Sequence, residues 1–225
     1  KCSIYFVTPA SCGINDNVSC INSREGLATL ANEVNKGDNK SGKIIYLTSD
    51  LDLGGKFDSD GNALDGNISW TPIGTVNNPF SGTFDGNGHI ISNMYVNRPN
   101  DNKNGLFGWA ENGLVKNIGI YASYVIGNVD QGAIIGQNGT VKNSFSFATI
   151  KGKGHSGGLC GSGCTVRNSY NGGNIINDIF DLAGGISGGL ESAYNCYNFG
   201  NVTSSRGSTA GIMGCFPGER HALSF

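Results

Sequence analysis

Charged residues are scarce in this chain of 225 residues: Asp, Glu, Lys and Arg make up 14%, and the formal net charge is −2. The chain has no basic run, and its arginines are not interleaved with aromatic residues. Basic runs and arginines interleaved with aromatic residues are the two features that mark surfaces that bind nucleic acid. The composition therefore excludes nucleic acid as the expected partner.

Long hydrophobic runs are missing as well. No stretch approaches the ~20 apolar residues that a membrane-spanning helix needs. Ile4-Tyr5-Phe6-Val7 is too short for the core of a signal peptide. We therefore expect no membrane insertion and interpret the chain as a mature sequence.

Cys-x-x-Cys pairs, which are typical of zinc sites, do not occur. The seven cysteines form two groups, Cys2, Cys12 and Cys20 near the start and Cys160, Cys164, Cys196 and Cys215 further on. The first group can form one disulfide with one cysteine left over, and Cys160 and Cys164 can bridge a turn. We interpret Cys196 and Cys215 as small residues that face the core. Because seven is odd, at least one thiol is free or bonds another chain, and an extracellular or cell-surface location fits best.

Glycine and asparagine, by contrast, are abundant, with 37 and 28 residues. They recur between short β-branched runs, as turn residues do. One phrase, Gly-hydrophobic-x-Gly with a single variant, returns five times at spacings of 28, 25, 27 and 26 residues. Its copies begin at Gly105, Ala133, Gly158, Gly185 and Gly211. A fixed period of this size predicts a solenoid, in which each repeat buries its apolar face against its neighbours.

Alignment of the repeats places equivalent residues in columns. We expect three short strands per repeat, with equivalent residues stacked ~4.8 Å apart in a coiled parallel sheet. The apolar columns are Leu106, Ile134, Leu159, Ile186 and Ile212, and then Val125, Ile150, Ile175 and Val202. Beside them lies an aromatic column of Phe145, Tyr170 and Tyr197, in which Gly119 is the exception.

Asparagine forms a column of its own, made of Asn117, Asn143, Asn168 and Asn195. Stacked amides can donate to one neighbouring coil and accept from the other, which satisfies buried polar groups at a turn. We interpret this ladder as structural. A ligand-binding row would need exposed aromatic residues or charges in register with it.

The N-terminal part differs from the repeats. Asn22-Ser23-Arg24-Glu25 offers a capping-box pattern, and Leu27, Leu30, Ala31 and Val34 then follow a helical period. We therefore predict an N-terminal cap segment over residues 1–42, with one α-helix at about 23–36, and a β-helix over 43–225 with repeats from about 104.

The segment Trp70-Thr71-Pro72-Ile73-Gly74, the segment from Pro79 to Ile91 and the Gly-Leu-Phe-Gly phrase resemble the GLUG-motif repeats of bacterial surface proteins. These include adhesins and regions that flank IgA-peptidase-type enzymes. The resemblance covers roughly residues 23–215. It implies an all-β fold, a right-handed parallel β-helix, in an extracellular or cell-surface setting, and it brings no catalytic motif.

A polysaccharide-cleaving β-helix would need two carboxylates, or a calcium cluster, within reach of one sugar. Among the acidic residues of 105–215, only Glu111 and Glu191 share a column, and they lie three coils apart, about 14 Å by the strand spacing. His89 and His155 have no serine or cysteine nucleophile tied to them by spacing, so both are interpreted as surface or structural residues.

One acidic loop imitates the start of a calcium site with Asp58, Asp60, Asn62 and Asp65. Ala63 occupies the position where an EF-hand requires glycine, so we expect a solvated turn, with calcium as the alternative. No other cofactor is expected.

We conclude that the chain is a non-catalytic secreted or cell-surface β-helix that serves as an adhesive or structural module. After Gly214 the next coil segment is missing, which predicts end-to-end assembly with another copy or with further domains of the same protein. The alternatives are a carbohydrate-cleaving enzyme and a module that binds a host or matrix glycan or protein. For glycans the candidate exposed aromatic residues are Trp109, Tyr121 and Tyr124.

Overall fold

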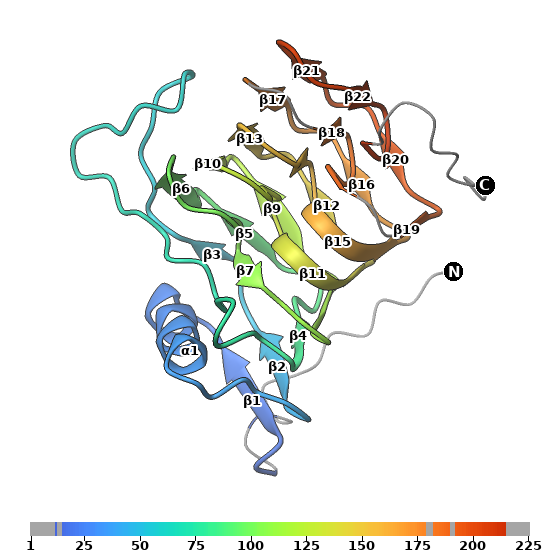
Figure 1. Cartoon of the computed structure of the whole chain (residues 1–225). Helices are drawn as coiled ribbons and strands as arrows, with labels where there is room; N and C mark the ends of the chain where they lie inside the picture. Colours follow the sequence, from blue (N-terminus) through green and yellow to red (C-terminus); the bar gives the residue numbers. More distant parts are fainter. Residues whose placement is uncertain (1–11, 13–14, 179–181, 190–191, 215–225) are drawn as a thin grey trace, which may run out of the picture.

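The computed structural model describes residues 12, 15–178, 182–189 and 192–214. Within them the chain is a parallel β-helix of about seven turns with one α-helix, as predicted. Figure 1 shows the coils stacked from β1 at one end to β21 and β22 at the other. Cys2, Cys215, Glu191 and the chain beyond Gly214, on which several predictions rest, lie outside the described residues.

Four parallel sheets form the sides of the stack. The first contains β1 (Val18–Ile21), β2 (Ile44–Leu47), β4 (Thr83–Asp85), β7 (Phe107–Trp109), β8 (Leu114–Lys116), β11 (Ile135–Lys142), β15 (Cys160–Arg167) and β19 (Ser192–Tyr194). The second contains β3 (Leu51–Asp52), β5 (Ile90–Ser92), β9 (Gly119–Tyr121), β12 (Phe145–Ser146), β16 (Tyr170–Asn171) and β20 (Tyr197–Asn198). The third contains β6 (Tyr95–Arg98), β10 (Tyr124–Gly127), β13 (Thr149–Gly152), β17 (Ile175–Asn177) and β21 (Val202–Ser204).

The fourth sheet is short and was not expected from the repeats. It contains β14 (Ser156–Gly157), β18 (Ala183–Gly184) and β22 (Thr209–Ala210). Its glycines allow the backbone to pass close to the next coil, because a Cβ at Gly157 would lie 2.6 Å from Gly188 N of that coil. The prediction of three strands per repeat is therefore wrong for the coils that contribute a strand to this fourth sheet.

The strand register confirms the predicted columns. Val125 pairs with Ile150, Ile150 with Ile175, and Ile175 with Val202. All but Val202 are fully buried, and Val202 packs against the same core. This column therefore supplies one core residue per coil, as a solenoid requires. The Gly-hydrophobic-x-Gly phrase supplies another, since Leu106, Ile134, Leu159 and Ile186 are fully buried and Ile212 packs against the core.

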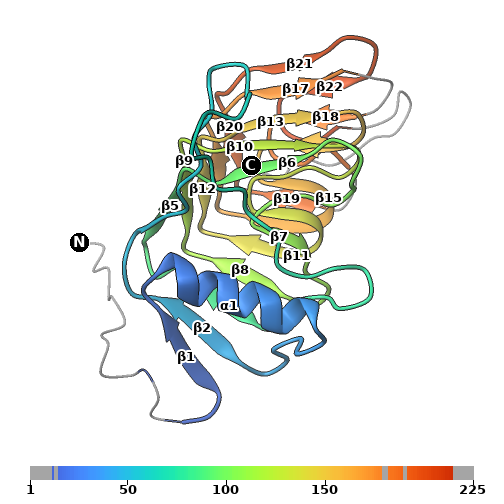
Figure 2. The same ribbon diagram turned by 90° about the vertical axis from the view of Figure 1, so that its left-hand side faces the viewer.

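Helix α1 (Arg24–Asn35) lies across the N-terminal coils, as Figure 2 shows. Ser23 is the N-cap, and its Oγ accepts a hydrogen bond from Gly26 N at 3.1 Å. The third helical position is this glycine, so the reciprocal half of the predicted capping box is absent here. Four buried apolar residues of α1 join the core, namely Leu27, Leu30, Ala31 and Val34.

The β-helix also begins earlier than predicted. β1 lies inside the expected cap segment of residues 1–42, yet it pairs in parallel with β2, from Val18 with Ile44 to Ile21 with Leu47. The helix therefore belongs to the first coil, after β1. Within the described ranges no helix has the length and apolar character needed to cross a membrane.

The asparagine ladder forms at the corner between the first and second sheets. Asn143 Nδ2 donates to Asn117 Oδ1 at 3.2 Å, Asn168 Nδ2 to Asn143 Oδ1 at 3.2 Å, and Asn195 Nδ2 to Asn168 Oδ1 at 3.0 Å. All four residues have positive φ angles of 50–54°, which asparagine tolerates better than most residues. Asn143, Asn168 and Asn195 are exposed, so the expectation that the ladder satisfies buried groups is wrong.

Two features complete this corner. Asp85 ends the ladder: its Oδ1 accepts from Asn117 Nδ2 at 2.9 Å, and Lys116 Nζ lies 3.1 Å from its Oδ2. The residue after each ladder amide points inward, and there the buried polar groups are satisfied. Ser169 Oγ donates to Arg167 O at 2.7 Å and accepts from Ser144 N at 3.1 Å.

We predict that Asn168→Ala lowers the free energy of unfolding by about 1–2 kcal/mol, because alanine is strained at positive φ and cannot continue the ladder. Asn168→Gly removes the same amide without that strain and should lose less. Urea unfolding of both variants measures the difference. Equal losses would show that backbone conformation is not the reason for asparagine here.

Candidate functional site

The most distinctive surface of the molecule is an array of aromatic side chains on the second sheet, which we call the aromatic face. It consists of Tyr121, Phe147 and Phe199 in one column and of Phe145, Tyr170 and Tyr197 in the next. Tyr121, Tyr197 and Phe199 are 54%, 55% and 59% exposed. Contiguous exposed apolar groups on a soluble protein mark an interaction surface.

The rings contact each other along the whole face. Phe145 and Tyr170 are stacked with centroids 5.1 Å apart, and Tyr170 and Tyr197 are stacked at 5.0 Å. In the other column Phe147 lies 6.0 Å from Tyr121 and 5.8 Å from Phe199 in edge-on arrangements. Burial in the stack raises the pKa of the Tyr170 phenol. The Tyr170 ring is therefore neutral at physiological pH.

Two glycines occupy the remaining outward positions of these four coils. A Cβ at Gly119 would collide with the Phe145 ring, and a Cβ at Gly172 would meet the rings of Phe147 and Phe199 at 2.5 Å. Each glycine is thus covered by a ring from a neighbouring coil. Gly119, which interrupts the aromatic column of the sequence, therefore leaves room for the Phe145 ring.

Between the aromatic positions, polar residues point into the solenoid. Asn171 is fully buried, and its amide donates to Gly173 O at 2.9 Å and to Asn198 Oδ1 at 2.9 Å. Its Oδ1 accepts from Gly173 N at 3.1 Å. Ser146 Oγ likewise accepts from Ala148 N at 3.0 Å. These residues must face inward to bond the following turn, and the strand alternation then sends the aromatic residues outward.

A cationic column lies on the first sheet, beside the asparagine ladder. Lys116, Lys142 and Arg167 occupy equivalent positions, one residue before each ladder amide. Lys116 pairs with Asp85, whereas Lys142 and Arg167 are exposed and have no ion pair within the described part of the chain. Arg167 lies over the Tyr194 ring, 4.6 Å from its centroid. Charges and exposed aromatic residues are therefore in register with the ladder, which is the condition for a binding row.

The three aromatic residues predicted for glycan contact lie in different places. Tyr121 belongs to the aromatic face. Tyr124 is 4% exposed, and its hydroxyl donates to Asp60 O at 3.1 Å, so the prediction that it is exposed is wrong. Trp109 is half-buried, with Lys103 Nζ 5.2 Å from its ring centroid. The structure does not bring these three together.

The acidic loop forms its own internal hydrogen bonds. Asp58 Oδ1 accepts from the backbone N–H groups of Asp60 and Asn62, both at 2.9 Å, and Asp58 Oδ2 accepts from Asn62 Nδ2 at 2.9 Å. These bonds keep the pKa of the Asp58 carboxyl below its ordinary value. Asp65 is exposed. Among the described residues no group of three or more His, Cys, Asp or Glu side chains is placed to hold a metal.

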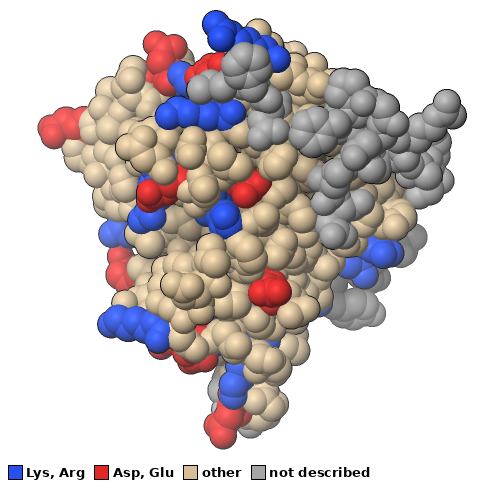
Figure 3. Space-filling view, viewed as in Figure 1, with Lys and Arg blue, Asp and Glu red and all other residues tan. Residues whose placement is uncertain are grey.

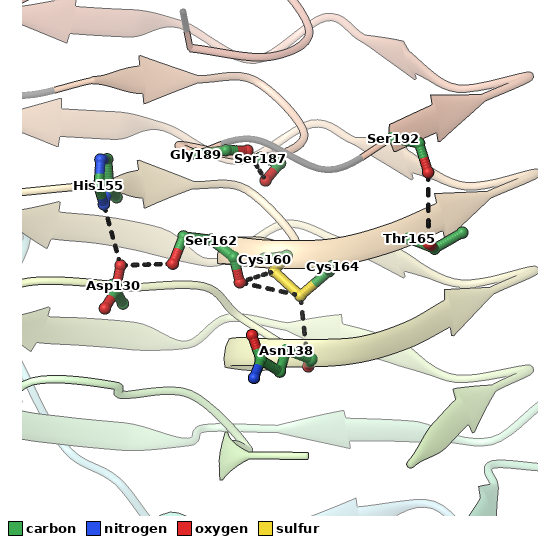
Figure 4. Close-up of a disulfide and its surroundings, with 10 residues drawn as sticks. All are labelled: Asp130, Asn138, His155, Cys160, Ser162, Cys164, Thr165, Ser187, Gly189 and Ser192. Carbon is green, nitrogen blue, oxygen red and sulfur yellow. Dashed lines mark hydrogen bonds and ion pairs between the residues drawn. A yellow bond between two sulfur atoms is a disulfide. The ribbon is translucent and has the colours of Figure 1, made fainter. Parts of the chain in front are cut away.

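A buried carboxylate, Asp130, collects polar partners that the sequence spacing did not connect (Figure 4). Ser162 Oγ donates to Asp130 Oδ1 at 2.6 Å, and His155 Nδ1 lies 3.1 Å from the same oxygen. The carboxylate stands between the hydroxyl and the imidazole. This order, from hydroxyl to carboxylate to imidazole, differs from the serine–histidine–carboxylate order of a catalytic triad, and the cluster ties adjacent coils together.

Two disulfides, Cys12–Cys20 and Cys160–Cys164, lie within the described residues. The second lies beside the Asp130 cluster (Figure 4). Cys196 is a free thiol in the column of Ser144 and Ser169, the place predicted for a small inward-facing residue. Burial raises its thiol pKa.

A groove of about 500 Å³ separates α1 from the segment 68–71. Ala28, Ala31, Leu53 and Ile68 form its apolar wall. Trp70 also borders it but uses its indole N–H internally, donating to Leu106 O at 3.1 Å. The groove is thus wide enough for a small ligand, but no set of reactive groups among the described residues converges on it.

Charged side chains are scattered over the view in Figure 3, and large areas between them carry none. Fold and surface together define a class: a disulfide-containing parallel β-helix with an exposed aromatic face. No family model matches the chain.

The chain is similar in sequence to parts of two much longer proteins. It is 35% identical to halomucin of Haloquadratum walsbyi over 106 residues, which is 46% of this chain and 1% of halomucin. It is 32% identical over 114 residues to a candidate Gly-rich membrane protein of Evansella cellulosilytica, covering 50% of this chain and 12% of that protein. The chain thus spans only a small part of these relatives.

A crystal structure of a candidate immunoglobulin A1 protease from Bacteroides ovatus shares the fold. Its TM-score is 0.56 at 18% identity, and the match covers 89% of this chain and 72% of that one. At this identity the likeness extends to the fold alone.

We predict that Cys196 reacts slowly with iodoacetamide in the native protein at pH 7.5. Burial raises its thiol pKa, so little of the reactive thiolate is present, and alkylation should accelerate as pH rises toward 10. Mass spectrometry of peptides after timed quenching measures the rate, with the urea-unfolded chain as control. A native rate equal to the unfolded rate at pH 7.5 would contradict the buried position.

Proposed function

We propose that this chain is a non-catalytic adhesive module of an extracellular or cell-surface protein, and that it binds glycan through its aromatic face. The observation that carries the proposal is the aromatic face itself: six side chains in contact across four coils, three of them more than half exposed. Aromatic rings stack on the C–H faces of sugars and lose little conformational freedom on binding.

The setting rests on three supports. Two disulfides suit an oxidising compartment. One relative is named as a Gly-rich membrane protein, and the chain corresponds to a small part of its length. The likeness of the repeats to GLUG-motif repeats stays a prediction and agrees with a surface location.

The proposal is non-catalytic because of the chemistry of the described residues. Ser162 and His155 both contact the Asp130 carboxylate, an order that differs from the serine–histidine–carboxylate order of an activated nucleophile. The outward positions of the aromatic face carry no carboxylate that could serve as acid or base. Calcium at Asp58 and end-to-end assembly remain predictions and are not needed for this function.

We expect the chain to bind at least one class of glycan on an array, and Tyr197→Ser/Phe199→Ser to weaken this binding about tenfold or more. The reason is that two exposed rings are removed from the contact surface. Leu64→Ser/Val76→Ser is the matched control, because these apolar residues are 51% and 59% exposed but lie in loops away from the face.

Far-ultraviolet circular dichroism and thermal unfolding establish that each variant is folded. Absence of binding to every glycan, or equal loss in the control variant, would overturn the adhesive proposal.

A further inference from the structure

We infer that the ligand of the aromatic face is an extended anionic polysaccharide that lies along the stack of coils. This inference rests on the proposed function and goes beyond it by naming the chemical class and the orientation of the ligand. It depends on the register of three columns: the cations, the ladder amides and the rings.

Two neighbouring coils present a cation, a ladder amide and a ring in the same order, and the amide and an exposed ring continue in the coil that follows. In one coil Lys142 is followed by Asn143 at the corner and by Phe145 and Phe147 on the aromatic face. The next coil places Arg167, Asn168 and Tyr170 beside them. Since the set of groups repeats between these two coils and its amide and ring continue in the next, a ligand that uses all of it must also repeat, which indicates a polymer rather than a single small molecule.

The ladder amides retain hydrogen-bonding capacity toward a ligand. Each asparagine has two N–H donors and two acceptor lone pairs. The ladder uses one N–H of Asn143 for Asn117 and one lone pair of its oxygen for Asn168. The same holds for Asn168, which accepts from Asn195. The remaining donor and acceptor of these exposed amides suit hydroxyl and carboxylate groups.

The sign of the ligand charge follows from the neighbouring column. Lys142 and Arg167 are exposed and have no carboxylate partner within the described residues. The carboxylates nearest in register on the second sheet are Asp50 and Asp52, and they lie at its N-terminal end, two coils from Tyr121. The carboxylate in the cationic column itself, Asp85, is buried and paired with Lys116. A carboxylated chain along the corner would thus meet Lys142 and Arg167, with Asp85 already neutralised.

The second possible occupant is another copy of this chain. A second copy is less favoured, because two aromatic faces pressed together would also bring the two cationic columns near each other. The net charge of the chain does not offset the repulsion between these columns. The experiment includes this outcome.

Binding to polygalacturonate, measured by affinity electrophoresis and by isothermal titration calorimetry, tests the inference. Fully methyl-esterified polygalacturonate is the matched ligand, since it keeps the sugar rings and masks the carboxylates. We expect retention by the free acid form at least about tenfold stronger than by the ester, and weakening of that retention as salt is raised.

Lys142→Gln/Arg167→Gln should lower the affinity for polygalacturonate about tenfold and leave any affinity for the ester unchanged. Lys151→Gln/Lys153→Gln changes the net charge by the same amount elsewhere on the molecule. Lys151 lies in β13 of the third sheet and Lys153 just after it, so this variant should bind like the unmodified chain. This control separates a local contact from a general effect of charge.

The outcomes distinguish the two proposals. Equal binding to both polymers, or equal losses in the two charge variants, overturns the anionic assignment while the adhesive function stands. Binding to neither polymer overturns the anionic assignment, and the glycan array then decides the adhesive function. A dimer in sedimentation that Tyr197→Ser/Phe199→Ser converts to a monomer would show that a second copy occupies the face, and would overturn the inference.

Discussion

The in-register pairing of successive coils is the constraint on which the rest of this structure depends. In the C-terminal coils residues 25–27 apart pair strand to strand, so each coil places its side chains directly over those of the previous one. The same register builds the apolar columns inside, the asparagine ladder at the corner and the stacked rings outside. A shift of one residue would turn every inward side chain outward, because side chains alternate along a strand.

Hydrophobicity and hydrogen bonding compete on the second sheet, and hydrogen bonding decides the outcome in its C-terminal coils. Ile91 and Ile120 face inward in the earlier coils, where the core is apolar. In the later coils Ser146 and Asn171 take this column, since their side chains bond the backbone of the following turn. An unbonded buried N–H at that turn would cost about 1–3 kcal/mol. The aromatic residues lie outside as a consequence, and the molecule gains a binding surface.

Much of the architecture could be predicted from the repeats. The columns, the helix and the ladder follow from spacing, because a solenoid repeats its contacts with its sequence. The orientation of the aromatic column could not be predicted, since Phe145-Ser146-Phe147 fits an aromatic-inside strand equally well when the turn bonds are unknown. The burial of Tyr124 beneath the 56–66 loop and the meeting of Ser162 with Asp130 depend on contacts between residues 64 and 32 positions apart. The fourth sheet was missed because its strands are two residues long.

The proposed ligand contacts the aromatic face together with the ladder amides and the cationic column beside it. Titration of a chain with carbon-13-labelled tyrosine rings, followed by nuclear magnetic resonance as polygalacturonate is added, tests it most directly. We expect shifts for Tyr121, Tyr170 and Tyr197 and none for the buried Tyr95 and Tyr124. Shifts at the buried rings, or an unchanged face at saturating polymer, would contradict it.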